Sequence, residues 1–102
     1  YRTYLWGTGA ASQIAIYPNL NTADPVWRNT LRDVRVRRAL SLAINRAAIN
    51  RALYFKLAKP GAMSVLEQSP FFRPEFREAW ASFDPEQANE LLDQAGLTEK
   101  DG

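Results

Sequence analysis

Two kinds of hydrophobic pattern follow one another along the chain. Residues 1–6 and 13–17 are rich in aromatic and β-branched side chains, which predicts two short strands. Pro18 ends the second strand, and residues 19–25 combine Asn, Thr, Asp and Pro in a way that predicts a turn. From residue 33 onward, apolar residues recur at helical spacing. The pattern therefore predicts an α+β segment that is mostly helical: two short strands, a helix pair, a loop, a short helix and a capped helix.

The middle of the chain is predicted to form the helix pair. Asp33 is the expected N-cap of the first helix, and Asn45 is the expected N-cap of a second helix that runs to about Leu57. The apolar stripe of the first helix consists of Val36, Ala39, Leu40, Ala43 and Ile44. The stripe of the second consists of Ile49, Ala52, Leu53 and Leu57. Because almost no linker separates the helices, we expect a sharp corner in which the two stripes share one core.

The last helix has signals at both ends. A short helix is expected from Pro74, and after it Asp84 is the expected N-cap of the final helix. Gln87, three residues further on, is predicted to complete a capping box. Gly96 is expected to end the helix in a left-handed conformation, with Leu97 folding back in a Schellman arrangement.

Composition narrows the possible chemistry. The 102 residues include no His and no Cys, which excludes a Ser-His-Asp triad, disulfides and the usual zinc sites within the chain. The paired carboxylates at positions 75 and 78, and at 86 and 90, lie near expected helix N-termini, where the helix dipole favours the ionised acid. We therefore predict no enzymatic activity, no cofactor and no metal. No apolar run approaches the ~20 residues of a membrane helix.

The net charge of +2 conceals a strong asymmetry. Residues 28–59 carry nine bases against one acid, and residues 60–102 carry three bases against nine acids. One interpretation of the basic 28–59 segment is a helical module that binds nucleic acid or a protein. The other is that the basic residues pair within the fold or face solvent. No recognition-module signature accompanies the run, so we do not expect a nucleic-acid partner.

Ligand contacts are expected where the chain leaves the second strand. Loops on a rigid scaffold carry binding residues more often than helices do. This favours the aromatic and amide side chains of Tyr17, Asn19, Asn21 and Trp27. The alternative is that the two asparagines only satisfy the backbone of their own turn.

Several motifs recur in the order that one known family has. They are YPNLN at 17–21, DVRVRRALSLAINR at 33–46, KLAKP at 56–60 and FDPEQANELLDQAGL at 83–97. In this combination the chain resembles family 5 of the bacterial extracellular solute-binding proteins, the dipeptide- and oligopeptide-type receptors of ABC importers. Asn45 stands where the family more often has Asp, and both residues cap a helix.

The resemblance implies a place in a larger architecture. Members of the family have two lobes that close on a solute about hinge strands. Residues 1–21 would then be strands approaching the hinge, and residues 22–102 the helical part of the second lobe of a type II periplasmic-binding-protein fold. The implied partners are a peptide-like solute and the membrane permease, and the implied location is periplasmic or otherwise extracytoplasmic. We also expect the isolated chain to self-associate, since a partial lobe leaves apolar faces uncovered.

Overall fold

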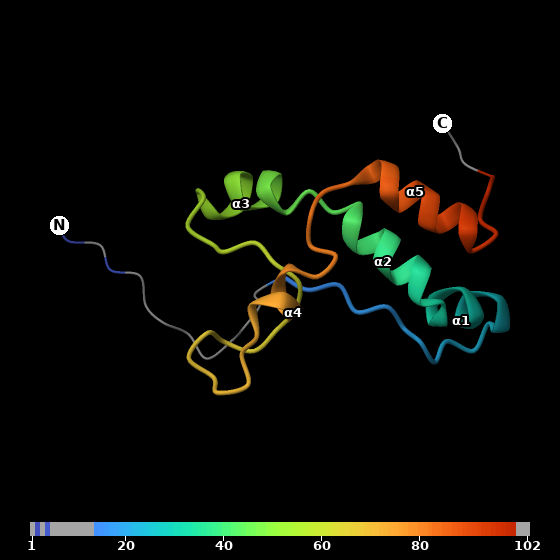
Figure 1. Ribbon diagram of the computed structural model, residues 1–102, viewed down its shortest axis with the longest axis horizontal. Helices are drawn as coiled ribbons and strands as arrows, with labels where there is room; N and C mark the ends of the chain where they lie inside the picture. Colours follow the sequence, from blue (N-terminus) through green and yellow to red (C-terminus); the bar gives the residue numbers. More distant parts are fainter. Residues whose placement is uncertain (1, 3, 5–13, 100–102) are drawn as a thin grey trace.

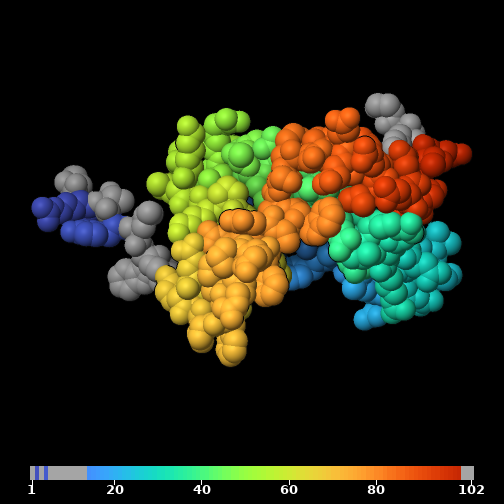
Figure 2. All heavy atoms as spheres, viewed as in Figure 1, coloured from blue at the N-terminus to red at the C-terminus, as the bar shows by residue number. Residues whose placement is uncertain are grey.

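The computed structural model describes residues 2, 4 and 14–99, and these residues form five helices. In chain order they are α1 (Pro25–Arg32), α2 (Val34–Leu42), α3 (Arg46–Tyr54), α4 (Pro74–Glu78) and α5 (Pro85–Gln94). Helix α5 packs along α2, and α1 contacts α2 (Figure 1). In the space-filling view these three helices gather at one side of the main body, and α3 with the segment that follows it lies on the opposite side (Figure 2).

The strand expected over residues 13–17 is not formed. Residues 14–17 are described, and they belong to no β-ladder. Residue 13 and most of the strand expected over residues 1–6 lie outside the described residues. The prediction rested on side-chain propensity, whereas a strand also requires a neighbouring strand to complete its hydrogen bonds. In the part that the structure describes, the fold is therefore helical rather than α+β.

Helix α1 was not predicted, because the turn expected over residues 19–25 passes directly into it. The carboxylate of Asp24 accepts hydrogen bonds from the backbone nitrogens of Val26 at 2.8 Å and Trp27 at 3.2 Å. Pro25 occupies the first helical position, where its missing N–H costs nothing. The same Asp-Pro pair begins the final helix at Asp84, so the sequence contained the signal for α1.

The core is small and lies between α2 and α5. Its buried residues are Ala39 and Leu42 on α2 and Ala88 on α5, with Leu91 and Leu92 packed against them. Val36 on α2 is buried as well, outside this cluster. Leu42 is only 1% exposed, although the predicted stripe did not include it. Leu40, which the stripe did include, is 46% exposed, and Ala43 is exposed as well. Helix α5 covers the face that carries Ala39 and Leu42. The predicted stripe is therefore right at Val36 and Ala39, which are buried, and wrong at Leu40 and Ala43.

The expected sharing of one core by α2 and α3 is also wrong. Helix α3 contacts no other helix of the described chain, and Ile49, Leu53 and Leu57 of the predicted stripe are exposed. Asn45 is the N-cap of α3, and its side chain accepts a hydrogen bond from the nitrogen of Ala48 at 2.9 Å. The turn between the two helices carries α3 past the end of α2 and away from α5 (Figure 1).

Helix α3 ends earlier than the periodicity predicted. Phe55 and Lys56 adopt left-handed conformations, with φ of 51° and 66°. The Asn50 side chain closes the turn that follows. Its Nδ2 donates to the Ala58 carbonyl at 2.8 Å, and its Oδ1 accepts from the Ala58 nitrogen at 3.1 Å. The Asn50 side chain therefore satisfies the backbone N–H and carbonyl of Ala58, which are not part of a helix.

The N-terminus of α5 is joined to the C-terminus of α2. Asp84 is the N-cap of α5, and its carboxylate accepts from the nitrogen of Gln87 at 2.9 Å. The reciprocal half of the expected capping box is replaced by a tertiary bond, because the Asp84 N–H donates to the Leu42 carbonyl at 3.0 Å. This bond satisfies one unpaired group at the end of each helix.

The C-terminus of α5 has the geometry of a Schellman motif. Gly96 has φ of 86°, and its N–H donates to the Asp93 carbonyl at 3.0 Å. The N–H of Leu97 donates to the Leu92 carbonyl at 2.9 Å.

Arg46 joins three segments that are distant in sequence. It donates to the carbonyls of Ser41 at 2.8 Å, Gly61 at 3.1 Å and Ala81 at 3.2 Å, and to the Ser41 hydroxyl at 2.8 Å. Partial burial lowers the pKa of Arg46. The guanidinium thus links the end of α2 to the segments before and after α4.

Among the residues that the structure describes, no helix has the length and apolar character required to cross a lipid bilayer.

The two leucines of α2 provide a test of the packing. Leu42→Ala is expected to lower the free energy of unfolding by about 2–5 kcal/mol, because it opens a cavity between α2 and α5. Leu40→Ala is the matched control, and it should cost less than about 1 kcal/mol because Leu40 is half exposed. Denaturant unfolding followed by circular dichroism measures both. Equal losses for the two variants would contradict the observed packing face.

Removing either cap of α5 should destabilise the chain. Asp84→Ala is expected to cost about 0.5–2 kcal/mol, whereas Asp84→Asn, which retains an acceptor, should cost much less. Gly96→Ala should cost about 1 kcal/mol through backbone conformation alone, since an added Cβ would meet nothing within 4 Å. Thermal unfolding of the three variants tests this, and an unchanged melting temperature for Asp84→Ala would argue against the capping role.

Candidate functional site

The four side chains expected to face a ligand lie on one segment that leads into α1. Tyr17 is in the extended part and is 71% exposed, and Trp27 is in the first turn of α1 and is 61% exposed. Asn19 and Asn21 are exposed in the turn between them. We call residues 17–21 the wall segment. The segment runs along the outside of the molecule before it enters α1 (Figure 1).

The wall segment is fixed by its own hydrogen bonds and by α1. The backbone nitrogen of Asn21 donates to Oδ1 of Asn19 at 3.0 Å. Arg32, the last residue of α1, reaches back with Nε to the Leu20 carbonyl at 2.8 Å and with Nη2 to Oδ1 of Asn21 at 3.0 Å. Arg28 also donates to the Thr22 carbonyl at 3.4 Å. The turn therefore has a defined conformation although its side chains are exposed.

Sequence reasoning missed the role of these two arginines. It treated Arg28 and Arg32 as members of a basic run, since nothing local pairs them with residues 20–22. The Asp24-Pro25 signal for α1 would have placed both on one helix that follows the turn directly. It would not have identified the carbonyls to which they donate.

Five arginines of the basic 28–59 segment donate to backbone carbonyls, namely Arg28, Arg32, Arg35, Arg37 and Arg46. Arg37 donates to the carbonyls of Leu31 at 2.9 Å and Arg32 at 2.6 Å, in the same way that Arg46 and Arg32 bind the carbonyls described above. The ion pair between Lys59 and Glu67, at 2.8 Å, connects the basic segment to the acidic one. Pairing within the fold thus accounts for much of the basic run, and carbonyl oxygens are the main partners.

Arg35 is held by the N-cap acid of α2, Asp33, and by the end of α5. Its Nη2 lies 2.6 Å from Oδ2 of Asp33, and its Nη1 donates to the Gln94 carbonyl. The side-chain hydrogen bond from Arg35, followed by the bond from the Arg35 backbone nitrogen at 2.8 Å, lowers the pKa of Asp33 from 3.8 to about 2. This arrangement favours a structural role for Arg35 over ligand binding.

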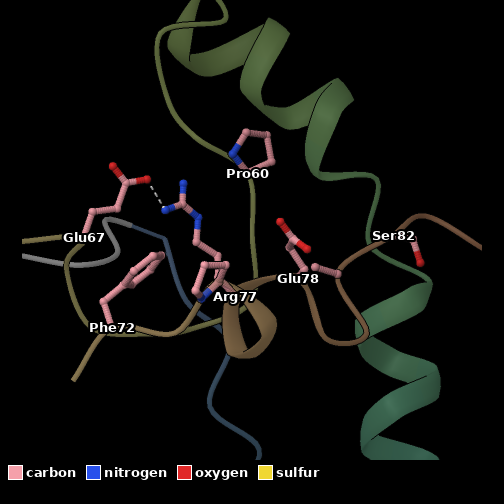
Figure 3. A pocket seen from close by; sticks show the side chains of 8 residues that line it. Pro60, Glu67, Phe72, Arg77, Glu78 and Ser82 are labelled. Atoms are coloured by element: carbon pink, nitrogen blue, oxygen red, sulfur yellow. Dashed lines mark hydrogen bonds and ion pairs between the residues drawn. The ribbon is translucent and has the colours of Figure 1, made fainter. Parts of the chain in front are cut away.

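A hollow of about 470 Å³ lies beside α4 (Figure 3). Its lining residues come from α4 and from the segments before and after it, and they are Pro60, Glu67, Phe72, Pro74, Arg77, Glu78, Ala81 and Ser82. Arg77 pairs with the Glu67 carboxylate across the hollow, and its guanidinium lies 5.6 Å from the centre of the Phe72 ring. Hydrogen bonding from Lys59 is the main cause that lowers the pKa of Glu67.

The hollow contains none of the four predicted ligand residues, and sequence reasoning did not foresee it. The charges of Arg77 and Glu67 largely satisfy one another, which leaves Glu78 and Ser82 as the other polar side chains of its lining. In the described part of the chain, no group of three or more acidic, His or Cys side chains is arranged to hold a metal ion.

Comparison with known proteins identifies the family. A family model described as "Bacterial extracellular solute-binding proteins, family 5 Middle" matches residues 4–102. The chain belongs to this family. Its members are solute-binding receptors rather than enzymes, and the resemblance inferred from the sequence motifs is thereby confirmed.

Individual relatives agree with this assignment. Putative ABC transporter peptide-binding proteins of Brucella ovis and Brucella abortus are each 35% identical to the chain over 91 residues. The match covers 89% of this chain and 16% of each relative. A solved structure of the oligopeptide-binding protein OppA is 48% identical, with a TM-score of 0.77 over 81% of this chain and 13% of that protein. The mostly helical fold therefore resembles one part of OppA, and the chain spans about a sixth of the length of its curated relatives.

The Asp33–Arg35 pair predicts a pH dependence. Because the pKa of Asp33 is lower in the folded chain than its ordinary value of 3.8, the pair stabilises the fold above about pH 4. This stabilisation is lost as the pH falls towards about 2. Asp33→Asn should retain the N-cap acceptor but remove this part of the acid sensitivity. Unfolding midpoints measured from pH 5 to pH 2 test the difference, and parallel curves for parent and variant would count against it.

Proposed function

We propose that this chain forms part of the substrate-binding receptor of an ABC importer that captures peptides or similar small solutes. The observation that carries the proposal is the 48% identity to OppA over 81% of the chain, together with the family match over residues 4–102. The names of the Brucella relatives point to the same class of receptor. Membership of a family of extracellular receptors further supports a periplasmic or other extracytoplasmic location, a membrane permease as partner, and no enzymatic activity.

Within such a receptor, we assign residues 1–21 to the approach to the hinge and residues 22–102 to the helical part of the second lobe. The fold resembles only a small part of OppA, so the cleft itself would be completed by other parts of the receptor. The exposed apolar side chains of α3, such as Leu53, and the neighbouring Phe55 then have an explanation as contacts with those parts. Self-association of the isolated chain is not needed to explain them, and the comparisons do not support it.

The wall segment is the proposed contribution of this chain to ligand binding. Tyr17 offers an exposed ring and hydroxyl, and the turn that follows it is held in one conformation by Arg32. Exposed groups on a fixed turn lose little conformational freedom on binding, which favours affinity. Trp27, which is 61% exposed in the first turn of α1, is the fourth proposed contact.

A nucleic-acid or protein interaction module based on residues 28–59 has less support. Five of its arginines, Arg28, Arg32, Arg35, Arg37 and Arg46, are engaged with carbonyl or carboxylate oxygens of the chain itself. Binding to phosphates would require these bonds to be exchanged, which removes much of the gain.

The test uses a full-length receptor that carries this segment. Tyr17→Ala and Asn19→Ala should each weaken oligopeptide binding by about tenfold, because each loses a contact of roughly 1–1.5 kcal/mol. Arg35→Ala is the control, and its affinity should match that of the parent. Isothermal titration calorimetry with alanine peptides of two to five residues provides the measurement, after thermal unfolding has shown that each variant folds.

Two outcomes would contradict the proposal in different ways. If the unaltered receptor binds no peptide of this set, the assignment to oligopeptide capture fails. If the receptor binds but all three variants match it, the ligand site lies elsewhere and the wall segment is scaffold.

A further inference from the structure

We propose that Asn19 and Asn21 act as paired hydrogen-bond donors that select acceptor groups of the solute, namely carbonyl or carboxylate oxygens. The inference rests on the proposed receptor function and specifies the chemistry of the wall segment within it. It follows from the hydrogen bonds within the fold, in which the amide oxygen of each Asn already accepts a donor.

The amide of Asn21 has a fixed orientation. Its neighbour is the guanidinium of Arg32, which has five N–H donors and no acceptor. The amide atom 3.0 Å from Nη2 of Arg32 must therefore be the oxygen. The opposite orientation would place two N–H groups against a cationic donor. The Nδ2 group remains, and it has no acceptor in the described residues.

The amide of Asn19 has the same orientation, with its oxygen toward a donor, and here the donor is a backbone N–H. Its Oδ1 accepts the backbone N–H of Asn21 at 3.0 Å, and a backbone N–H is again a donor only. The Nδ2 group of Asn19 likewise has no acceptor within the described part of the chain. Both side chains are exposed and lie two residues apart in one turn, so they present four N–H bonds, while each amide oxygen already accepts one bond.

This arrangement removes the usual versatility of asparagine. An unconstrained amide can rotate to offer either its oxygen or its nitrogen to a ligand. Here rotation would cost the bonds to Arg32 and to the turn backbone. Arg28 and Arg32 also place positive charge beside the turn, where each binds a carbonyl of residues 20–22. A solute ammonium group is therefore disfavoured at the wall segment, and a peptide carbonyl or carboxylate is favoured.

Substitution by aspartate separates the two functions of each amide. Asn21→Asp keeps an oxygen for Arg32 and Asn19→Asp keeps an oxygen for the turn, yet both lose the Nδ2 donors. The fold should be retained, because Asp is as well suited as Asn to this kind of turn. Asn29→Asp makes the same amide-to-carboxylate change on α1, where the Asn29 side chain is exposed and makes no hydrogen bond within the described chain.

The experiment measures binding of trialanine and tetraalanine to the full-length receptor by calorimetry. Asn19→Asp and Asn21→Asp should each bind at least about tenfold more weakly than the parent, without a lower melting temperature. Asn29→Asp should stay within about twofold.

Parent-like affinity of both wall variants would overturn the inference and leave the receptor function standing. An equal loss in all three variants would also overturn it, since a general effect of charge would then explain the result. A parent receptor that binds neither peptide would instead contradict the proposed function, and the inference would fall with it.

Discussion

The contact between α2 and α5 is the constraint on which the rest of the described fold depends. Small side chains make it possible, because Ala39 on one helix and Ala88 on the other let the backbones approach closely while Leu42 fills the space beside them. The Asp84 N–H then donates to the Leu42 carbonyl, which ties the start of α5 to the end of α2. A helix of nine residues and one of ten are too short to be stable in isolation, so their mutual burial stabilises both.

Outside this contact, arginine side chains hold the irregular segments in place. Arg46 binds carbonyls on three segments, Arg32 binds the turn at residues 20 and 21, and Arg37 binds the end of α1. A guanidinium is suited to this because its five donors have a fixed geometry and several carbonyls can share them. The DVRVRRALSLAINR motif at 33–46 therefore has two tasks. Its apolar positions build the small core, and Arg35, Arg37 and Arg46 satisfy backbone oxygens that a small core cannot cover.

An arginine bound to a backbone carbonyl also connects the helices to the proposed binding surface. Helix α1 starts at the Asp24 cap and ends at Arg32, and Arg32 returns to the turn that precedes the helix. The turn is thus fixed at both ends while its side chains remain exposed. In an importer receptor such a surface would meet a solute without first having to become ordered. The hollow beside α4 differs, since its main charged groups, Arg77 and Glu67, are already paired.

The sequence by itself determined the local features of this protein and its family. Asp33, Asn45, Asp84 and Gly96 stand at helix ends because capping depends on bonds between residues two to five positions apart, which a sequence displays directly. The order and wording of the motifs at 17–21, 33–46, 56–60 and 83–97 likewise stand in the sequence itself, and they identified the family. The tertiary structure decided which face of α2 is buried, since Leu40 and Leu42 are equally apolar and only the position of α5 distinguishes them. It also decided that residues 14–17 form no strand and that Arg32 orients Asn21, because both depend on partners that the sequence does not place.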